Sequence, residues 1–320
     1  MKPLFTLIAL FLSAICFAQR QNVYFLKNNG RYVDARDSAD YLRIVREPDS
    51  ASVLYNVFEF YLNNKPKLVG KSTKIDPPRY EGQCITFYQN GNKNSISNYK
   101  NGNPNGTEFL FYPNGKVYLV KEYPDNAAYS PIVDNFSIKA NYDSLGTALA
   151  ENGSGYCKLY DNAFKYIAEE GSIKNEKREG VWKGNFENEK TTFTETYANG
   201  ELVSGTAKFA DGQSTTYAKT RSVQPQFNGG ISAFSAYLGN NIQYPDYERG
   251  NDIQGVVIVE FVVEKDGKIS DIKVNKHVSD GLDKEAVRVI KKSPKWIPAT
   301  VFARPVRVRY RVPVNFALTN

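Results

Sequence analysis

The chain has 320 residues, a 41% apolar share and a formal net charge of +7. This length and composition fit about two folded domains and exclude a largely disordered chain. The charges are interleaved, without the basic runs broken by aromatic residues that nucleic-acid binders show, so we expect no nucleic acid as a partner. Tyrosine (22) and phenylalanine (19) are abundant and Asn-Gly turns recur, which favours a β-rich fold.

Residues 1–18 have the pattern of a secretory signal peptide. A short basic start precedes an apolar run from Leu4 to Ala18. This run is shorter than the ~20 apolar residues of a spanning helix, so we predict cleavage after Ala18 and a periplasmic protein. The alternative is an uncleaved run that holds the chain in the inner membrane, facing the periplasm. A lipoprotein signal at Cys16 is disfavoured because the preceding Ile15 is bulky.

Residues 19–220 predict a mainly β domain that contains a repeat. Residues 81–92 align with residues 105–116, and the pattern is clearest over 80–116 and 153–212, with a degenerate unit near residue 130. Each unit predicts a short aromatic strand, an Asn-Gly-type turn and a returning strand, and such hairpins must stack to bury a face. The units are similar to the MORN-like repeats of bacterial envelope proteins. Their aromatic residues predict the core of a β-stack; contact with a lipid or ligand is the alternative.

After the signal, the remaining cysteines are Cys84 and Cys157. Export permits a disulfide. However, the two residues lie three repeats apart, and a straight stack of strands would separate them well beyond the ~6 Å Cα distance of a bridge. We therefore expect two semi-buried free thiols.

The sequence from residue 224 to residue 320 predicts a separate α+β domain. A short helix over 231–238 is followed by Gly255–Val263, a strand whose composition indicates burial on both faces. Asp266-Gly267 predicts a tight primed turn into a second strand. Ser279 or Asp280 then caps a helix whose apolar stripe consists of Leu282, Ala286, Val289 and Ile290.

The last predicted strand, 306–316, alternates strictly between apolar and polar residues. One face carries Val306, Val308, Tyr310, Val312, Val314 and Phe316, and the other carries Arg307, Arg309, Arg311, Pro313 and Asn315. Pro313 has no N–H for a ladder, which favours an edge strand. The unit is thus a two-stranded hairpin, a helix and a final strand with one open edge.

Several motifs in this order resemble the C-terminal domain of the TonB family. They are Gln243-Tyr-Pro245, Phe261-Val-Val263, Asp266-Gly267, Pro294-Lys-Trp296 and Val312-Pro-Val-Asn-Phe316. In that family the domain binds a short segment of outer-membrane receptors. The resemblance implies that Gln243, Tyr244 and Pro245 contact such a peptide and that residues 306–316 supply main-chain bonds.

Arg307, Arg309 and Arg311 have two interpretations. They can add attraction to an acidic partner, or they can form a solvated polar face. We include them among the predicted peptide-binding residues.

The resemblance implies a periplasmic TonB-like protein that binds a peptide of an outer-membrane TonB-dependent receptor by β-strand addition and supports transport. Inner-membrane motor proteins or an anchored partner would supply the energy. Transducers of the family have an N-terminal anchor and a Pro-rich spacer, and this chain has a signal and repeats instead. The alternative is therefore a non-transducing envelope scaffold or adaptor, in which the domain docks or forms a homodimer.

The sequence contains no motif for catalysis, cofactor binding or metal binding. His277 is the single histidine and follows Lys276, as expected for a surface residue. No Cys/His spacing fits a metal site, and Gly153-Ser-Gly155 is a repeat turn without phosphate-binding context. We expect neither an enzyme nor a cofactor, although paired carboxylates can arise from the fold alone.

Overall fold

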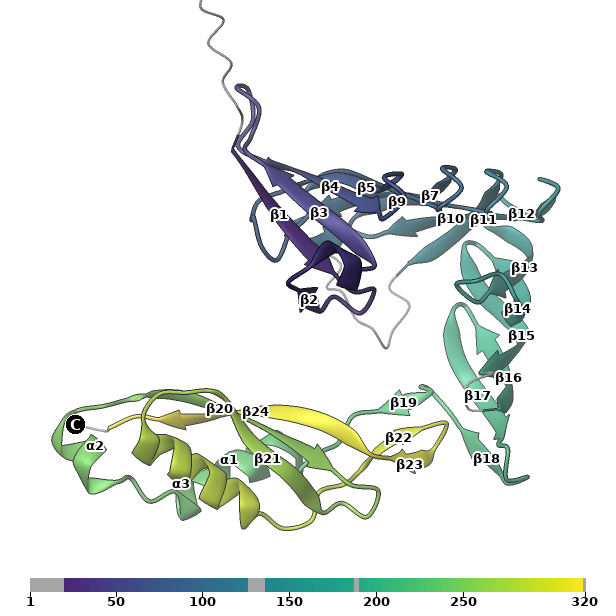
Figure 1. Cartoon of the computed structure of the whole chain (residues 1–320). Helices are drawn as coiled ribbons and strands as arrows, with labels where there is room; N and C mark the ends of the chain where they lie inside the picture. Colours follow the sequence, from purple (N-terminus) through teal and green to yellow (C-terminus); the bar gives the residue numbers. More distant parts are fainter. Residues whose placement is uncertain (1–19, 126–135, 187–189, 319–320) are drawn as a thin grey trace, which may run out of the picture. The chain divides into compact units, whose positions relative to one another are not determined.

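The computed structural model describes residues 20–125, 136–186 and 190–318 (Figure 1). The predicted signal peptide and the degenerate repeat near residue 130 lie outside these ranges. The chain divides into two compact units, Met1–Ser154 and Gly155–Asn320. Within the described ranges, no helix is long and apolar enough to cross a membrane.

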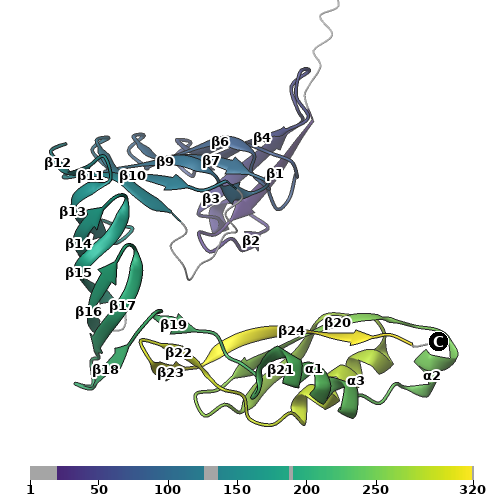
Figure 2. The same cartoon turned by 180° about the vertical axis from the view of Figure 1, so that it is seen from behind.

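The first unit is an antiparallel β-meander with one short 3-10 helix. β1 pairs with β2 and β3, and the later strands pair in chain order, with β7 contacting both β8 and β9 (Figure 2). The elements are β1 (Gln21–Leu26), β2 (Tyr32–Val33), η1 (Arg36–Ser38), β3 (Tyr41–Arg46), β4 (Tyr55–Tyr61), β5 (Pro66–Ser72), β6 (Gly82–Phe87), β7 (Lys93–Lys100), β8 (Asn103–Pro104), β9 (Gly106–Phe111), β10 (Val117–Tyr123), β11 (Ser137–Tyr142) and β12 (Ala148–Glu151).

The sequence repeat corresponds to equivalent hairpin turns. The amide of Tyr88 donates to the carbonyl of Asn92 at 2.8 Å, and the amide of Tyr112 donates to that of Lys116 at 2.8 Å. The tyrosine hydroxyls then reach the next hairpin, where Tyr88 donates to the carbonyl of Phe111 at 2.6 Å. Each repeat is therefore joined to its neighbour through its turn as well as through the strand ladder.

An earlier turn of the same kind had no glycine to mark it in the sequence. The amide of Tyr61 donates to the carbonyl of Lys65 at 2.9 Å, and its hydroxyl donates to that of Phe87 at 2.7 Å. Asn64, with φ 63°, takes the left-handed position that glycine holds in the other turns. Asparagine adopts this conformation more readily than most residues, so the stack of hairpins begins before the first obvious repeat.

The second unit continues the hairpin pattern and ends in an α+β segment. Its elements are β13 (Ser154–Tyr160), β14 (Ile167–Lys174), β15 (Lys177–Phe186), β16 (Thr191–Ala198), β17 (Glu201–Lys208), β18 (Ser214–Tyr217), β19 (Ser222–Val223), α1 (Gly230–Asn241), α2 (Asp246–Gly250), β20 (Gly255–Val263), β21 (Ile269–Lys276), α3 (Asp280–Lys291), β22 (Ala299–Val301), β23 (Arg304–Val306) and β24 (Val308–Phe316). β13 to β18 pair consecutively as antiparallel strands.

The glycines that mark the repeat in this unit have different roles. Gly180 has φ +67°, a conformation that L side chains rarely adopt. Gly205 has no such φ, but a Cβ there would lie 2.4 Å from the ring of Tyr217. A regular spacing of glycines thus combines turn geometry with room for aromatic rings.

Cys84 and Cys157 are both free thiols, as expected from their spacing. They are more deeply buried than expected, with 4% and 0% exposure. Burial raises the pKa of each thiol to about 12, so both stay protonated at neutral pH.

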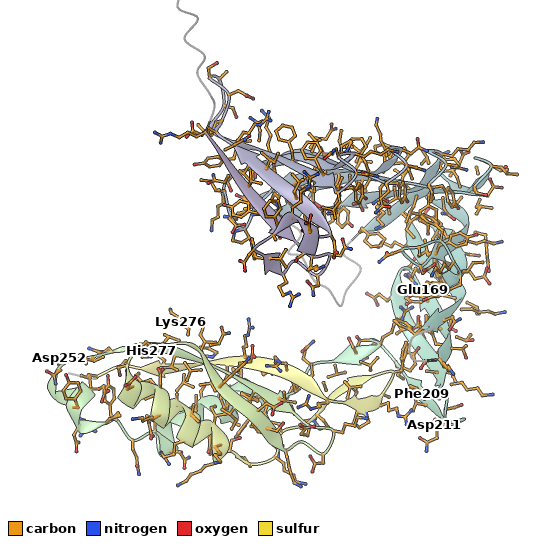
Figure 3. All side chains as sticks on the ribbon, in the orientation of Figure 1. Glu169, Phe209, Asp211, Asp252, Lys276 and His277 are labelled. Carbon is orange, nitrogen blue, oxygen red and sulfur yellow. The ribbon has the colours of Figure 1, made fainter. Side chains whose placement is uncertain are left out.

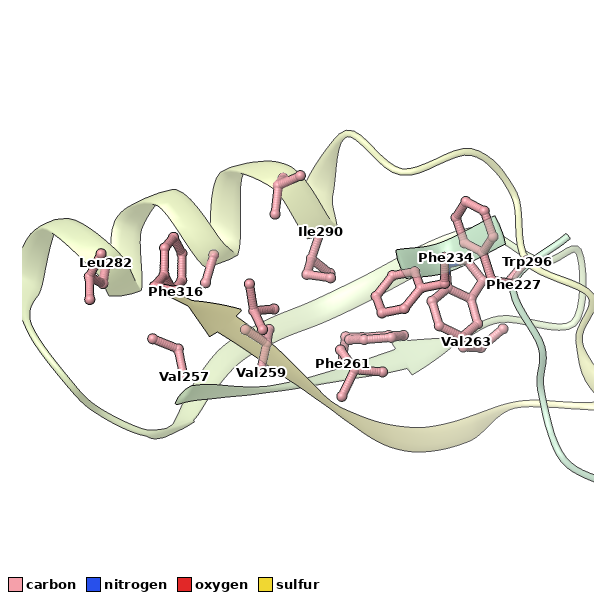
Figure 4. Close-up of a cluster of buried hydrophobic side chains, with 14 residues drawn as sticks. Phe227, Phe234, Val257, Val259, Phe261, Val263, Leu282, Ile290, Trp296 and Phe316 are labelled. Atoms are coloured by element: carbon pink, nitrogen blue, oxygen red, sulfur yellow. The ribbon is translucent and has the colours of Figure 1, made fainter. Parts of the chain in front are cut away.

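The α+β segment has a three-stranded sheet in the order β21-β20-β24. Residues from α1, α3 and the sheet form one core, part of which Figure 4 shows. The predicted stripe of α3 is buried in this core, and Ser279 caps the helix by accepting a bond from the amide of Leu282 at 3.3 Å. The buried carboxylate of Glu248, which the sequence did not reveal, accepts a second bond from the amide of Gly281 at 3.0 Å.

The predicted hairpin between β20 and β21 is confirmed, and Gly267 has positive φ, but the prediction of a tight primed turn is wrong. The turn is longer, because the amide of Glu264 donates to the carbonyl of Lys268 at 2.8 Å across residues 265–267. Within it, Gly267 has positive φ (81°), whereas Asp266 does not. The amide of Trp296 donates to the carbonyl of Gly267 at 2.9 Å, so the turn is fixed by a distant segment.

We expect Gly267→Ala to destabilise the protein by more than ~1 kcal/mol, because a Cβ is strained at this φ. It would also lie 2.1 Å from the carbonyl oxygen of Trp296. Gly239→Ala in α1 is the matched control, since a Cβ there meets nothing within 4 Å. It should stabilise the helix by ~0.5–1 kcal/mol. Urea unfolding followed by tryptophan fluorescence measures both, and equal effects of the two variants would contradict this account.

Candidate functional site

β24 is an edge strand, as its sequence predicts. It pairs with β20 in antiparallel register from Gly255 opposite Phe316 to Val263 opposite Val308. In the sheet order β21-β20-β24, no other described strand lies beyond it. One side of β24 therefore presents main-chain groups that no strand of the described chain pairs with.

Pro313 indicates which main-chain groups face the free side. Within a strand, proline is tolerated where its nitrogen points away from the neighbouring strand. N–H and C=O groups alternate between the two sides of a strand, and the β20–β24 register contains no bulge. The main-chain groups of Arg309, Arg311 and Asn315 therefore face the free side together with Pro313.

The face of the sheet opposite the helices contains a buried carboxylate. Glu260 on β20 is 2% exposed, and its oxygens accept from Arg309 Nη1 and Arg311 Nε, each at 2.6 Å. Lys273 Nζ lies 3.1 Å from the same carboxylate. The predicted burial of β20 on both faces is thus confirmed, but on this face ion pairs contribute to the cover.

The charges around Glu260 do not balance. Hydrogen bonds first from Arg309 and then from Arg311 and Lys273 lower its pKa to about 2, so it is ionised at neutral pH. Three cations share this one carboxylate, which leaves an excess of two positive charges. The side chains of Arg309 and Arg311 are 50% and 61% exposed, so this excess faces solvent beside the free edge.

Arg307 is arranged differently from the other two arginines. Its Nε lies 3.0 Å from Glu264 and its Nη2 lies 2.7 Å from Asp271. These two carboxylates more than balance its charge. Of the three predicted arginines, Arg309 and Arg311 are therefore the ones placed to attract an acidic group.

The predicted peptide-contact residues Gln243, Tyr244 and Pro245 form a loop near the Phe316 end of β24. The hydroxyl of Tyr244 donates to the carbonyl of Ile253 at 2.6 Å, and its ring packs edge-on against Phe316 at 5.8 Å between centroids. The amide of Gln243 donates to Glu285 Oε1 at 2.6 Å, while its side chain is exposed. The structure therefore brings the loop to the Phe316 end of the strand, and the arginines lie toward its beginning.

Pro245 ends the loop and precedes α2. Its carbonyl accepts from the amide of Arg249 at 2.9 Å, and the side chain of Arg249 donates to the carbonyl of Tyr244 at 3.2 Å. These contacts hold the loop from both sides. Tyr244 and Pro245 therefore stabilise the conformation of the loop, whereas the side chain of Gln243 is exposed to solvent.

His277 lies at the surface, after β21 (Figure 3). Its Nδ1 is 2.7 Å from Asp283, and this hydrogen bond raises the pKa of His277. Within the described ranges, no group of three or more His, Cys, Asp or Glu side chains is placed to hold a metal ion.

Residues 240–318 match the family model of the Gram-negative bacterial TonB protein C-terminal. The similarity to this family covers about a quarter of the chain and lies within the segment from α1 to β24. The NMR solution structure of the Helicobacter pylori TonB-CTD is similar at 24% identity, covering 29% of this chain and 90% of that chain with a TM-score of 0.23. No curated protein matches the chain. We call the segment from α1 to β24 the TonB-like domain; the MORN-like resemblance of the repeats stays a prediction.

We expect Glu260→Gln to lower the melting temperature at pH 7, because it leaves three cations together without their carboxylate. The folded pKa of about 2 lies below the ordinary value of 4.5. The contribution of Glu260 is therefore complete above pH 4.5 and is lost as the pH falls toward 2. The difference between variant and wild type should shrink accordingly in melts at pH 7, 4 and 3.

Glu201→Gln is the control for this experiment, because Glu201 is an exposed glutamate on β17. It should leave the melting temperature nearly unchanged. A Glu260→Gln difference that is absent at pH 7, or that stays constant down to pH 3, would refute the proposed ion cluster.

Proposed function

We propose that the TonB-like domain binds an extended peptide of an outer-membrane receptor by adding it as a strand to β24. The protein would act in the periplasm and support transport across the outer membrane. The observation that carries this proposal is the free edge of β24 in a segment that matches the TonB C-terminal family.

Strand addition would use two kinds of contact along β24. The main-chain groups of Arg309, Arg311 and Asn315 supply hydrogen bonds that do not depend on the peptide's sequence. The exposed guanidinium groups of Arg309 and Arg311 supply preference, because each has five N–H donors and Glu260 does not use them all. A peptide with acidic residues on this face is favoured.

The Gln243–Pro245 loop would contact the peptide where it passes the Phe316 end of β24. Tyr244 contributes by its packing against Phe316, which holds the loop beside the strand. Gln243 contributes an exposed amide that can donate and accept hydrogen bonds.

Energy for transport would come from inner-membrane motor proteins or from an anchored partner that this protein binds. The alternative function is a non-transducing scaffold or adaptor in the envelope, with the domain used for docking or for a homodimer. The stack of hairpin repeats, present in place of a Pro-rich spacer, is the feature that favours this alternative.

Asn315→Pro should weaken peptide binding roughly three- to tenfold, because it removes one N–H from the free edge, a loss of about 0.5–1.5 kcal/mol. Pro313→Val should strengthen binding by a similar factor, since it adds a donor on the same edge. Isothermal titration of the full chain with short peptides copied from periplasmic segments of the organism's outer-membrane receptors measures both. Unchanged affinities in both variants would exclude strand addition at this edge.

Gln243→Ala should weaken the same binding without loss of stability, because the Gln243 side chain is exposed. It is a better probe than Tyr244→Ala, which would also remove the internal contacts to Ile253 and Phe316. Gln254→Ala in the same region is less suitable, because that side chain accepts from the amide of Leu318. A complete absence of saturable peptide binding by the wild type would favour the scaffold function.

A further inference from the structure

The tip of the β22–β23 hairpin inserts into the end of the repeat stack. Phe302, at the tip, is 1% exposed although it lies in a tight turn. Its ring stacks on Phe193 at 5.3 Å and meets Tyr217 and Phe186 at 5.4 and 5.5 Å between centroids. The three partners belong to β15, β16 and β18, so a side chain from the C-terminal segment completes the aromatic core of the last repeats.

Hydrogen bonds also hold the backbone of the hairpin tip at Phe302. Phe302 and Ala303 have φ 51° and 60°, which fixes a sharp reversal. The amide of Phe302 donates to the carbonyl of Arg221 at 2.6 Å, and Thr215 Oγ1 donates to the carbonyl of Phe302 at 2.6 Å. Both main-chain polar groups of the buried tip residue are therefore satisfied by residues of the repeat stack or the segment directly after it.

Charged contacts surround this aromatic socket. Arg304 pairs with Asp211 and lies 4.6 Å from the centre of the Phe209 ring. Phe209 and Asp211 lie in the turn between β17 and β18 (Figure 3). Arg221 pairs with the fully buried Glu195 at 2.5 Å. The chain that leaves the repeats at Arg221 and the chain that returns at Arg304 are thus both fixed to the same stack.

The inserted hairpin continues directly into β24. β23 ends at Val306 and β24 begins at Val308, with Arg307 alone between them. β22 also pairs with β19, where Ser222 lies opposite Val301. Figures 1 and 2 show this hairpin beside β18 from both sides.

We infer that the β22–β23 hairpin is a lock that holds the TonB-like domain and the last repeats as one rigid body. A pull applied along β24 then passes through β23 into the repeat stack over a few residues of main chain. Residues 224–229, which join the last repeats to α1, do not carry this load. The lock stands on its own contacts, whether or not β24 binds a peptide.

An alternative is that the β22–β23 hairpin only shields the edge of β18 and does not fix the position of the TonB-like domain. An edge can be covered by a loosely attached segment, and linked domains reorient freely unless their interface is large and apolar. The contacts of this hairpin instead fix its position on the repeats. They are the buried Phe302 ring, the two main-chain bonds and the Arg304–Asp211 pair.

The test is a distance distribution between spin labels in the full chain. Thr196→Cys on β16 and Ile231→Cys on α1 place the labels at exposed positions on the two sides of the lock. We expect a narrow distribution in the wild-type background. Phe302→Ala combined with Arg304→Ala should widen it about twofold or more, because the domains then reorient. Val203→Ala, an exposed change on β17, is the control and should leave it narrow.

Cys16 is replaced by serine, and the labels go to the introduced cysteines because Cys84 and Cys157 are buried thiols. Hydrogen exchange of the α3 amides shows whether the variant domain is folded. If Phe302→Ala disrupts folding, Arg304→Ala alone decides the matter, with a smaller but measurable widening expected. A broad distribution in the wild type, or a narrow one in folded Arg304→Ala and in the double variant, would overturn the lock.

Discussion

The edges of β-sheets are the constraint on which this structure depends. A hairpin repeat satisfies its main-chain groups only by pairing with the next one, so a stack must end somewhere with an unpaired strand. At β18 the tip of the β22–β23 hairpin contacts that end, where Phe302 fills the aromatic socket. At β24 no strand of the described residues pairs with the outer edge. We infer that the hairpin tip at β18 holds the domain, and we propose that the edge of β24 binds its ligand.

Charge pairing inside the sheets is the second recurring element. Glu195 in the repeats and Glu260 in the TonB-like domain are both almost fully buried, and each is met by arginine. A buried carboxylate without such partners would be strongly destabilising. Around Glu260, however, the cations outnumber the carboxylate. The same cluster that allows the carboxylate to be buried therefore gives the open edge its positive character.

Local patterns made much of the fold predictable. Strict alternation over 306–316 with Pro313 predicted an edge strand, and the spacing of Leu282, Ala286, Val289 and Ile290 predicted α3. Features that depend on distant pairing were not predictable. Glu260 meets Arg309 and Arg311 only in the β20–β24 register, and Thr215 meets Phe302 across 87 positions. Likewise, the bond from the amide of Trp296 to the turn at Gly267 joins distant positions, and the local Asp-Gly signal did not reveal it.

Pro313 has a consequence for self-association. The free edge of β24 lacks one N–H donor, at Pro313. A peptide strand that pairs with this edge therefore loses a single hydrogen bond. Two copies that joined their β24 edges about a two-fold axis would bring two such gaps into one ladder, and would also face the Arg309 and Arg311 charges of one copy toward those of the other. The edge at which we propose peptide binding is therefore a poor surface for a second copy of this chain.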